Sequence, residues 1–351
     1  MVILIVLLIV LIVTQLVTHQ ILKRQHFGRG AYPDFANAAY FYDDYKDRYA
    51  REGVSFLSGK NRLQGYVYGT ENDKGLIVIS HGIGGGHENY INTIVWFLDR
   101  GWQVLAYDGT GSCESEGDGT VGLVQSALDL DAALSFIESE SRFAGLPVLL
   151  FGHSWGGYAV SAGLTFDHRV TASAALAAYS SPSDILFEKA RDVMGGAGIL
   201  LSPFLWFDQI LTFGRHASLS AVDSINSTAI PVLIVHGSED EMIAVDGAAL
   251  IAKKTRITNP NVEYLILDAP GQNSHNSIFR SPEAVPYIDD VNARFQTLFD
   301  QHKGQIPDEV RQAFMSGVDK ALVNRVNESL LLQIEKFYER ALADVSLESK
   351  R

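Results

Sequence analysis

Short runs of consecutive apolar residues recur through the middle of the chain and alternate with stretches of helical spacing. Strands of a parallel sheet have this unbroken apolar character because helices cover both faces of the sheet. Helices are predicted between the runs, at 92–100 and at about 122–139. The alternation predicts an α/β fold with a mostly parallel, doubly wound sheet. The predicted strands lie at residues 76–80, 102–107, 147–151, 171–179, 231–235 and 262–267.

The segments before this series have different patterns. Residues 54–58 and 63–68, joined by the turn Gly59-Lys60-Asn61, predict a β-hairpin. Residues 35–52 mix aromatic and charged side chains at helical spacing. We therefore expect a linker and a lead-in helix over 23–52, followed by a main α/β domain over 53–303.

The N-terminus is the most apolar part of the chain. Residues 1–22 carry no charged side chain, and 2–13 form an unbroken apolar run. About 20 such residues cross a bilayer. The charged start, shorter apolar stretch and small-residue cleavage site of a secretory signal are not evident. We therefore predict a single-pass, uncleaved transmembrane anchor over 1–22. Lys23, Arg24 and Arg29 follow it and favour a cytoplasmic catalytic body; an exported protein with a cleaved signal is the alternative.

Two further segments do not fit the regular series. Residues 180–230 separate two strands by far more than an ordinary connection, which predicts a cap at about 180–230. Its aromatic residues Phe204, Trp206 and Phe207 suit an apolar substrate pocket, although they could instead pack the cap onto the body. After the last strand, apolar residues spaced four apart from 310 to 334 predict a helical extension over 304–351, which we expect to dock or oligomerise. The oligomeric state stays open.

Charge and cysteine content exclude several classes of function. A net charge of -13 makes nucleic acid an unsuitable partner, because phosphate binding needs a basic face. The single cysteine, Cys113, excludes an intrachain disulfide and a Cys-x-x-Cys zinc site. The glycine-rich run at 82–86 lacks the Gly-Lys-Ser/Thr ending of a phosphate-binding loop. We therefore expect no cofactor and no metal.

Candidate chemistry gathers on loops that follow the predicted strands. The pentapeptide Gly152-His153-Ser154-Trp155-Gly156 directly follows an apolar strand and is typical of a nucleophile elbow. A serine nucleophile needs a histidine base and an acid to orient that base. Asp240 and His275 follow later strands in the required order, with Glu239 or Asp246 as alternative acids. Such loops meet at the carboxyl edge of a parallel sheet.

Four stretches resemble the α/β-hydrolase superfamily over roughly residues 50–300, and the chain is most similar to its monoacylglycerol-lipase and lysophospholipase-like enzymes. These stretches are His81-Gly82-Ile83-Gly84, the loop from Asp108 to Gly117, the elbow, and His236-Gly237-Ser238-Glu239-Asp240. Cys113 is an atypical residue in the second stretch, and Ser274 replaces the glycine that usually precedes the final histidine.

The resemblance implies specific roles around Ser154. Backbone N–H groups of Ile83 and Trp155 would form the oxyanion hole. His81 would brace the oxyanion loop; His87 and His153 are expected to be structural, and Cys113 to be a small buried residue.

The sequence thus predicts a membrane-anchored serine hydrolase of carboxylesterase or lipase type that cleaves lipid-like or other apolar acyl esters. Ser154 would attack, His275 would act as base and then acid, and Asp240 would orient the histidine. The alternatives are an amidase or peptidase on the same scaffold, or a non-catalytic binding protein with this fold.

Overall fold

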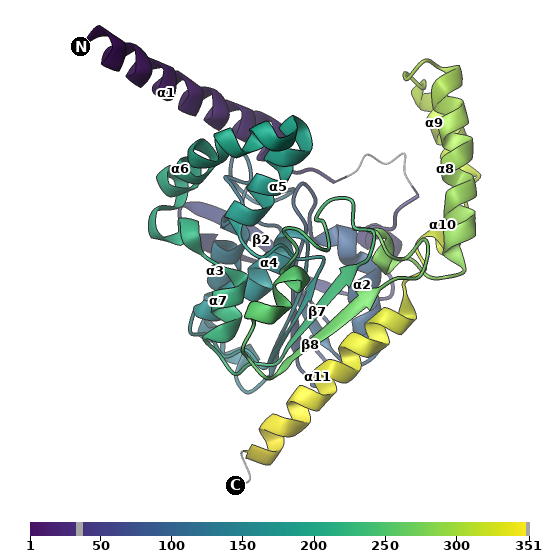
Figure 1. Cartoon of the computed structure of the whole chain (residues 1–351). Coiled ribbons are helices and arrows are strands. Elements are labelled where there is room, and N and C mark those ends of the chain that lie inside the picture. Colours follow the sequence, from purple (N-terminus) through teal and green to yellow (C-terminus); the bar gives the residue numbers. More distant parts are fainter. Residues whose placement is uncertain (33–37, 349–351) are drawn as a thin grey trace.

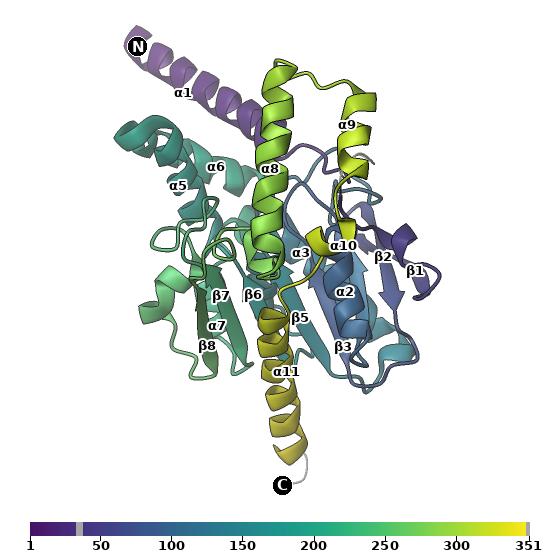
Figure 2. The same cartoon turned by 90° about the vertical axis from the view of Figure 1, so that its right-hand side faces the viewer.

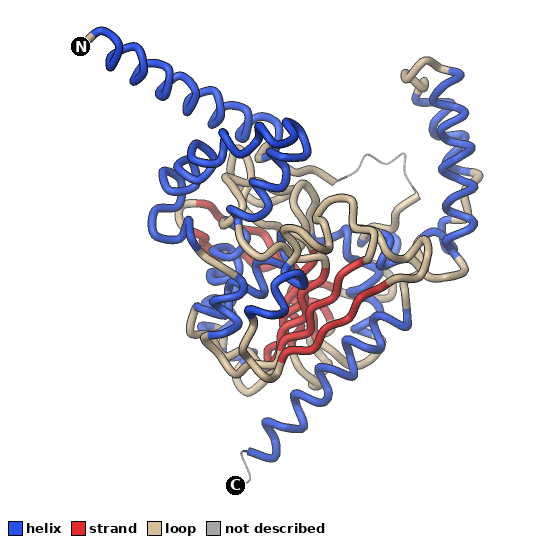
Figure 3. Tube along the Cα trace, in the orientation of Figure 1, coloured by secondary structure: helices blue, strands red, loops and turns tan. Residues whose placement is uncertain are grey.

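A twisted sheet forms the centre of the molecule, with helices on both faces (Figure 1, Figure 3). The structure is a computed structural model that describes residues 1–32 and 38–348. Within these residues the eight strands follow the order β1-β2-β4-β3-β5-β6-β7-β8. β1 and β2 pair antiparallel, as does β2 with β4, and the remaining neighbours are parallel. The predicted mostly parallel sheet and the hairpin are confirmed. The strands are β1 (Arg51–Ser58), β2 (Asn61–Tyr68), β3 (Leu76–Ser80), β4 (Gln103–Tyr107), β5 (Val148–His153), β6 (Ala172–Leu176), β7 (Val232–Gly237) and β8 (Val262–Leu267).

Alternate residues of the central strands enter two separate cores. Val78 and Leu150 pack under α3 (Gln125–Ser139), α4 (Trp155–Ala162) and α7 (Ala221–Asn226). Their neighbours Ile77 and Leu149 pack on the other face, under α2 (Ile91–Leu98) and α11 (Glu328–Glu348). Because both faces are buried, the strands need the continuous apolar runs seen in the sequence.

The last helix, α11, is an integral layer of the fold (Figure 2). The Tyr338 hydroxyl, which is buried, donates to the Leu150 carbonyl at 2.7 Å. Trp102 Nε1 donates to Glu335 Oε1 at 2.9 Å. The four-residue apolar spacing after 304 is divided among α9 (Asp308–Ser316), α10 (Lys320–Val323) and α11. α8 (Ala284–Gln301) and α9 form a hairpin that projects from the body (Figure 2).

The N-terminal helix α1 (Val2–Ile21) projects beside the insertion between β6 and β7 (Figure 1). This insertion contains α5 (Pro182–Met194), a 3-10 stretch (Gly195–Leu201) and α6 (Ser202–Phe213). By length and composition, Val2–Arg24 and the broken segment Pro182–Asn226 are the two helical stretches of the described residues that could cross a membrane. The base of α1 contacts α6, where His19 Nδ1 lies 2.8 Å from Asp208 Oδ1.

The predicted lead-in helix is wrong where it can be judged. Its residues 35–37 lie outside the described residues, and the rest contains only a 3-10 turn at Tyr42–Asp44 before β1 begins. The aromatic residues pack individually against neighbouring elements instead of forming one helical face. The Tyr45 hydroxyl donates to Asn92 at 2.9 Å, and Tyr42 lies under the Arg51 guanidinium at 3.9 Å. These tertiary contacts override the local helical spacing.

Candidate active site

Ser154 lies at a sharp turn between β5 and α4. Its backbone angles, φ 57° and ψ -115°, are strained for a residue with a side chain and are typical of a nucleophile elbow. A Cβ on Gly156 would lie 1.9 Å from the Ser80 carbonyl oxygen, and one on Gly152 would lie 2.1 Å from the Gly156 oxygen. Only glycine fits at these two positions, so the flanking glycines are what allow the serine to stand at the tip.

The structure brings Ser154, His275 and Asp240 together in one hydrogen-bonded chain. His275 Nε2 lies 2.9 Å from Ser154 Oγ, and His275 Nδ1 lies 2.8 Å from Asp240 Oδ2. The two alternative acids, Glu239 and Asp246, are exposed side chains. Asp240 is therefore the carboxylate that contacts the histidine.

Asp240 is held in its ionised form. Burial alone would raise its pKa, but hydrogen bonds from His236 and His275 outweigh burial and keep the pKa well below its ordinary value. Its second oxygen accepts the backbone N–H groups of Met242 and Ile243, each at 2.8 Å. The ionised carboxylate holds the proton of His275 on Nδ1, which leaves Nε2 to accept from the serine hydroxyl.

A neutral histidine connects the loop of His275 to the loop after β3. Burial and the neighbouring His275 lower the pKa of His153 to about 3. His153 Nε2 donates to the His275 carbonyl oxygen at 3.0 Å, and its Nδ1 lies 2.8 Å from the Tyr90 hydroxyl, which accepts from Gly82 N–H at 3.1 Å. His153 is structural, as predicted. The hydrogen bond between His153 and Tyr90 could not be predicted from the sequence. The position of His153 directly before Ser154 was the one sign that its ring lies near the site.

The two predicted oxyanion donors lie next to the elbow. α4 begins at Trp155, directly after the serine, so its first N–H groups have no partner inside the helix. Ile83 follows Gly82, and a Cβ on Gly82 would lie 3.6 Å from Ser154 Cβ. Neither the Ile83 nor the Trp155 N–H donates a hydrogen bond within the described residues. Their role as oxyanion donors stays a prediction.

His81 braces this loop in the expected way. Its Nε2 accepts the Gly109 N–H at 2.8 Å, and its Nδ1 donates to the Gly82 carbonyl at 2.7 Å. Burial lowers the pKa of His81, which keeps the ring neutral and lets one nitrogen accept while the other donates.

The predicted pocket residues lie on α6. Trp206 and Phe207 are 48% and 46% exposed, and Phe204 is half-buried. The depression of about 270 Å³ that Trp206 lines also contains Ser181 and Asp184 but not Ser154. The role of these three aromatics as a substrate pocket stays a prediction.

No group of three or more His, Cys, Asp or Glu side chains in residues 1–32 and 38–348 is arranged to hold a metal ion.

Comparison with known proteins agrees with the fold described above. A family model described as "Serine aminopeptidase, S33" matches residues 71–203, less than half of the chain but including the elbow. The Pyrococcus furiosus esterase Pf2001 superposes with a TM-score of 0.54 at 16% sequence identity, covering 78% of this chain and 98% of the esterase. The chain has the α/β-hydrolase fold. The part that the serine aminopeptidase model matches contains Ser154 and its flanking glycines.

Other solved structures resemble this chain less closely. Est1E from Butyrivibrio proteoclasticus, bound to ferulic acid, has a TM-score of 0.47 at 17% identity and covers 63% of this chain and 90% of its own. The acylaminoacyl peptidase of Pyrococcus horikoshii has a TM-score of 0.48 at 18% identity, covering 65% of this chain and 38% of the peptidase. No curated protein matches the sequence significantly.

Proposed function

We propose that this α/β-hydrolase cleaves carboxylic esters through an acyl-enzyme intermediate. The observation that carries the proposal is the continuous contact from Asp240 through His275 to Ser154, with distances of 2.8 and 2.9 Å. Ser154 Oγ attacks the ester carbonyl carbon while its proton passes to His275 Nε2. His275 then protonates the departing alcohol, and water attacks the acyl group by the same route in reverse.

The oxyanion of each tetrahedral intermediate would accept the N–H groups of Ile83 and Trp155. Such preorganised donors contribute about 3–4 kcal/mol each to lowering the barrier in comparable sites. Their availability next to Ser154 supports this role.

We further propose that α1 anchors the enzyme in a membrane and that the substrates are lipid-like. The cap exposes an apolar surface beside the base of α1, which the His19–Asp208 contact joins to α6. An exposed apolar surface of this kind next to a membrane helix is suited to the interface between headgroups and acyl chains. Its exposed apolar residues include Val193, Ile199, Leu200, Trp206, Phe207 and Leu211.

The proposed orientation of the enzyme in the membrane rests on the basic residues at the C-terminal end of α1. The exposed Lys23 and Arg24 stand at the inner end of α1, so the catalytic body is proposed to lie on the cytoplasmic side. Protease added outside intact cells should leave the body undigested; digestion from outside would instead favour an exported enzyme.

Ester hydrolysis is tested by labelling and turnover together. A fluorophosphonate probe should label the folded wild-type chain and not Ser154→Ala. Turnover of p-nitrophenyl esters should rise with acyl chain length up to the size that the site accepts. Absence of labelling, with wild type and Ser154→Ala behaving alike, would favour a non-catalytic binding protein.

A second candidate function is amide hydrolysis, which the description of the matching family model favours. The same triad serves both reactions. Aminoacyl anilides measured beside the esters separate the two, and faster anilide turnover would replace the ester proposal.

A further inference from the structure

The segment that follows the membrane helix is built into the catalytic body. We define the juxtamembrane strap as residues 27–32, which come after α1 and a π-helical turn at Leu22–His26. The strap pairs with the loop after β4: Gly30 N–H donates to the Gly111 carbonyl at 2.9 Å, and Cys113 N–H donates to the Gly30 carbonyl at 3.0 Å. Thr120 N–H donates to the Phe27 carbonyl at 3.1 Å. A flexible linker would not form these backbone hydrogen bonds.

The Arg29 side chain binds the strap to the loop after β4. Its guanidinium donates to the carbonyl oxygens of Gly117, Cys113 and Ser115 at 2.7, 2.6 and 2.8 Å. Three acceptors from a single loop match the fixed fork of a guanidinium and hold that loop in one shape.

The strap also touches the oxyanion loop, which we define as residues 82–86. A Cβ on Gly30 would lie 3.1 Å from the Gly84 carbonyl carbon and oxygen and 3.2 Å from the Gly85 oxygen. The two backbones are therefore in direct contact. Gly84 itself has φ 82°, so this part of the loop adopts a conformation that glycine favours and that has little rigidity of its own.

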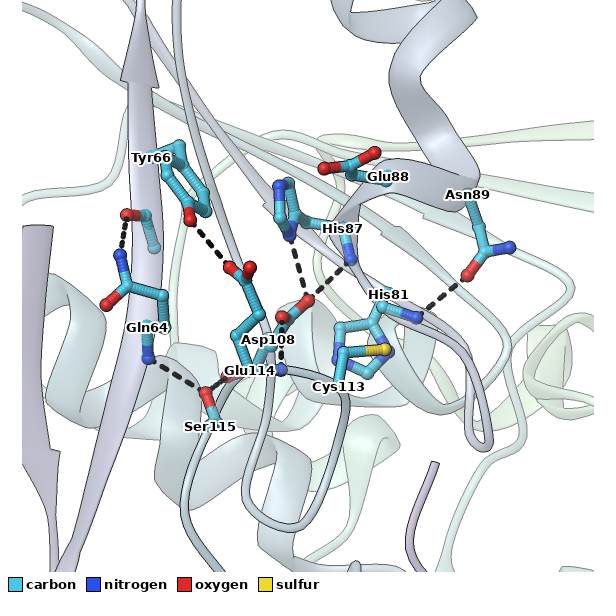
Figure 4. Close-up of polar contacts among 12 residues, drawn as sticks. Gln64, Tyr66, His81, His87, Glu88, Asn89, Asp108, Cys113, Glu114 and Ser115 are labelled. Carbon is cyan, nitrogen blue, oxygen red and sulfur yellow. Dashed lines mark hydrogen bonds and ion pairs between the residues drawn. The ribbon is translucent and has the colours of Figure 1, made fainter. Parts of the chain in front are cut away.

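The far end of the oxyanion loop is held by a buried cluster that the strap completes. Asp108 Oδ1 accepts the backbone N–H of His87 at 2.8 Å and lies 2.9 Å from its ring Nδ1 (Figure 4). The Tyr32 hydroxyl donates to the same carboxylate at 3.0 Å and lies 2.8 Å from His87 Nδ1. Both His87 and Asp108 side chains are fully buried.

We propose that the juxtamembrane strap positions the oxyanion hole, with Gly30 and Tyr32 as positioning residues for the N–H of Ile83. The proposal rests on the proposed ester hydrolysis. Its reason is mechanical: a glycine-rich loop that must hold an N–H donor within about 0.5 Å needs support from outside. Here Tyr90 holds one end at Gly82, Asp108 holds the other at His87, and Gly30 packs against the middle. The segment that follows α1 would thereby support the groups that act on the substrate.

The experiment uses the full chain in detergent with a water-soluble ester, p-nitrophenyl butyrate, so that membrane access plays no part. Tyr32→Phe removes one hydroxyl, and Gly30→Ala introduces a methyl group against Gly84. Each should lower kcat about tenfold while KM stays within about twofold, since total loss of an oxyanion donor costs about 10²–10³ in kcat. A trifluoromethyl ketone, whose tetrahedral adduct places an oxyanion in the same hole, should lose affinity by the same factor.

Tyr45→Phe is the matched control, because it removes a tyrosine hydroxyl that donates to Asn92 on α2 and not to a residue of the strap or the oxyanion loop. It should leave kcat and ketone affinity unchanged. Unchanged kcat and unchanged ketone affinity in both strap variants would overturn the strap proposal. If wild-type turnover itself does not depend on Ser154, the proposed hydrolysis fails instead, so the two failures are distinct.

Discussion

Two buried histidine–aspartate pairs stand at the carboxyl edge of the same sheet, and they differ in what surrounds the ring. His275 and Asp240 lie 2.8 Å apart, and His87 and Asp108 lie 2.9 Å apart. The far nitrogen of His275 faces the Ser154 hydroxyl at 2.9 Å. The far nitrogen of His87 instead faces the Arg51 guanidinium at 3.4 Å. A guanidinium only donates, so this nitrogen cannot take a proton from a nucleophile.

The third partner decides what such a buried pair can do, because a hydroxyl can give up a proton whereas a guanidinium can only donate hydrogen bonds. The His275 pair ends at a hydroxyl that can lose a proton. In the His87 pair, backbone and tyrosine donors surround the carboxylate, so the pair joins the oxyanion loop to the loop after β4. Substitutions in the two pairs should therefore give different kinds of loss.

The largest expected effect comes from the His275 ring. His275→Gln removes the proposed base and should lower kcat/KM by about 10⁵-fold, as loss of a catalytic histidine does in serine hydrolases. Stopped-flow and long-time assays with p-nitrophenyl butyrate measure the loss, and the thermal unfolding midpoint should change little. A loss below about 100-fold would mean that His275 is not the base.

Asp240→Asn should have the next largest effect. The amide cannot stabilise the imidazolium or fix the proton on Nδ1, so kcat should fall by about 10³–10⁴-fold with KM nearly unchanged. Asp246→Asn is the control, because this exposed carboxylate makes no contact with His275. A stronger loss from Asp246→Asn than from Asp240→Asn would reassign the acid.

A substitution in the His87–Asp108 pair should mainly lower the stability of the fold. Although burial opposes the charge, hydrogen bonding to His87 lowers the pKa of Asp108 from 3.8 to about 2. A folded-state pKa below the unfolded value stabilises the native state above about pH 4, by about 2 kcal/mol, and this contribution is lost as the pH falls toward 2. Asp108→Asn should lower the free energy of unfolding by at least this amount at pH 7. The difference in unfolding free energy between the variant and wild type should be smaller near pH 3.

Thermal midpoints followed by intrinsic fluorescence from pH 3 to pH 7 measure this effect. Asp43→Asn is the control, because Asp43 pairs with Lys46 on the surface and is 81% exposed in its side chain. Its substitution should change stability by less than about 0.5 kcal/mol at every pH. If the difference in thermal midpoint between Asp108→Asn and wild type stayed constant across the pH range, the Asp108 charge would not be what stabilises the fold.

The sequence predicted the sheet and the contacts of Ser154 because these depend on short local patterns. Buried strands need unbroken apolar runs, and an elbow needs Gly152 and Gly156 at fixed positions around the serine. Chain order then placed Asp240 and His275 on loops at one edge of the sheet. Each of these inferences uses residues that are near each other in the chain or share a topological rule.

The cluster around the second pair could not be predicted because its residues come from three distant segments. Tyr32 belongs to the strap, His87 directly follows the oxyanion loop, and Asp108 begins the loop after β4. No spacing rule links them. The lead-in helix was wrong for a related reason. Its aromatic residues satisfy helical spacing but pack separately, as Tyr45 does on Asn92. Both structures depend on side-chain partners that lie far away in the sequence.

The smallest expected effect concerns the thiol next to the second pair. A Cβ on Gly86 would lie 2.6 Å from both Cys113 Sγ and Asp108 Oδ1, so the sulfur stands beside the His87–Asp108 pair. Burial, with the nearby Asp108 charge, raises the pKa of Cys113 to about 12. The thiol should therefore remain protonated and unreactive at neutral pH, since only the thiolate is a nucleophile.

Cys113→Ala should accordingly change kcat/KM by less than about twofold, because removal of a protonated thiol takes no nucleophile from the site. Iodoacetamide at pH 8 should modify the chain only after unfolding in guanidinium chloride, a difference that mass spectrometry measures directly. Rapid modification of the folded enzyme would show a thiolate beside Asp108. The His87 pair would then activate a nucleophile as the His275 pair is proposed to do, and the distinction between the two pairs would fail.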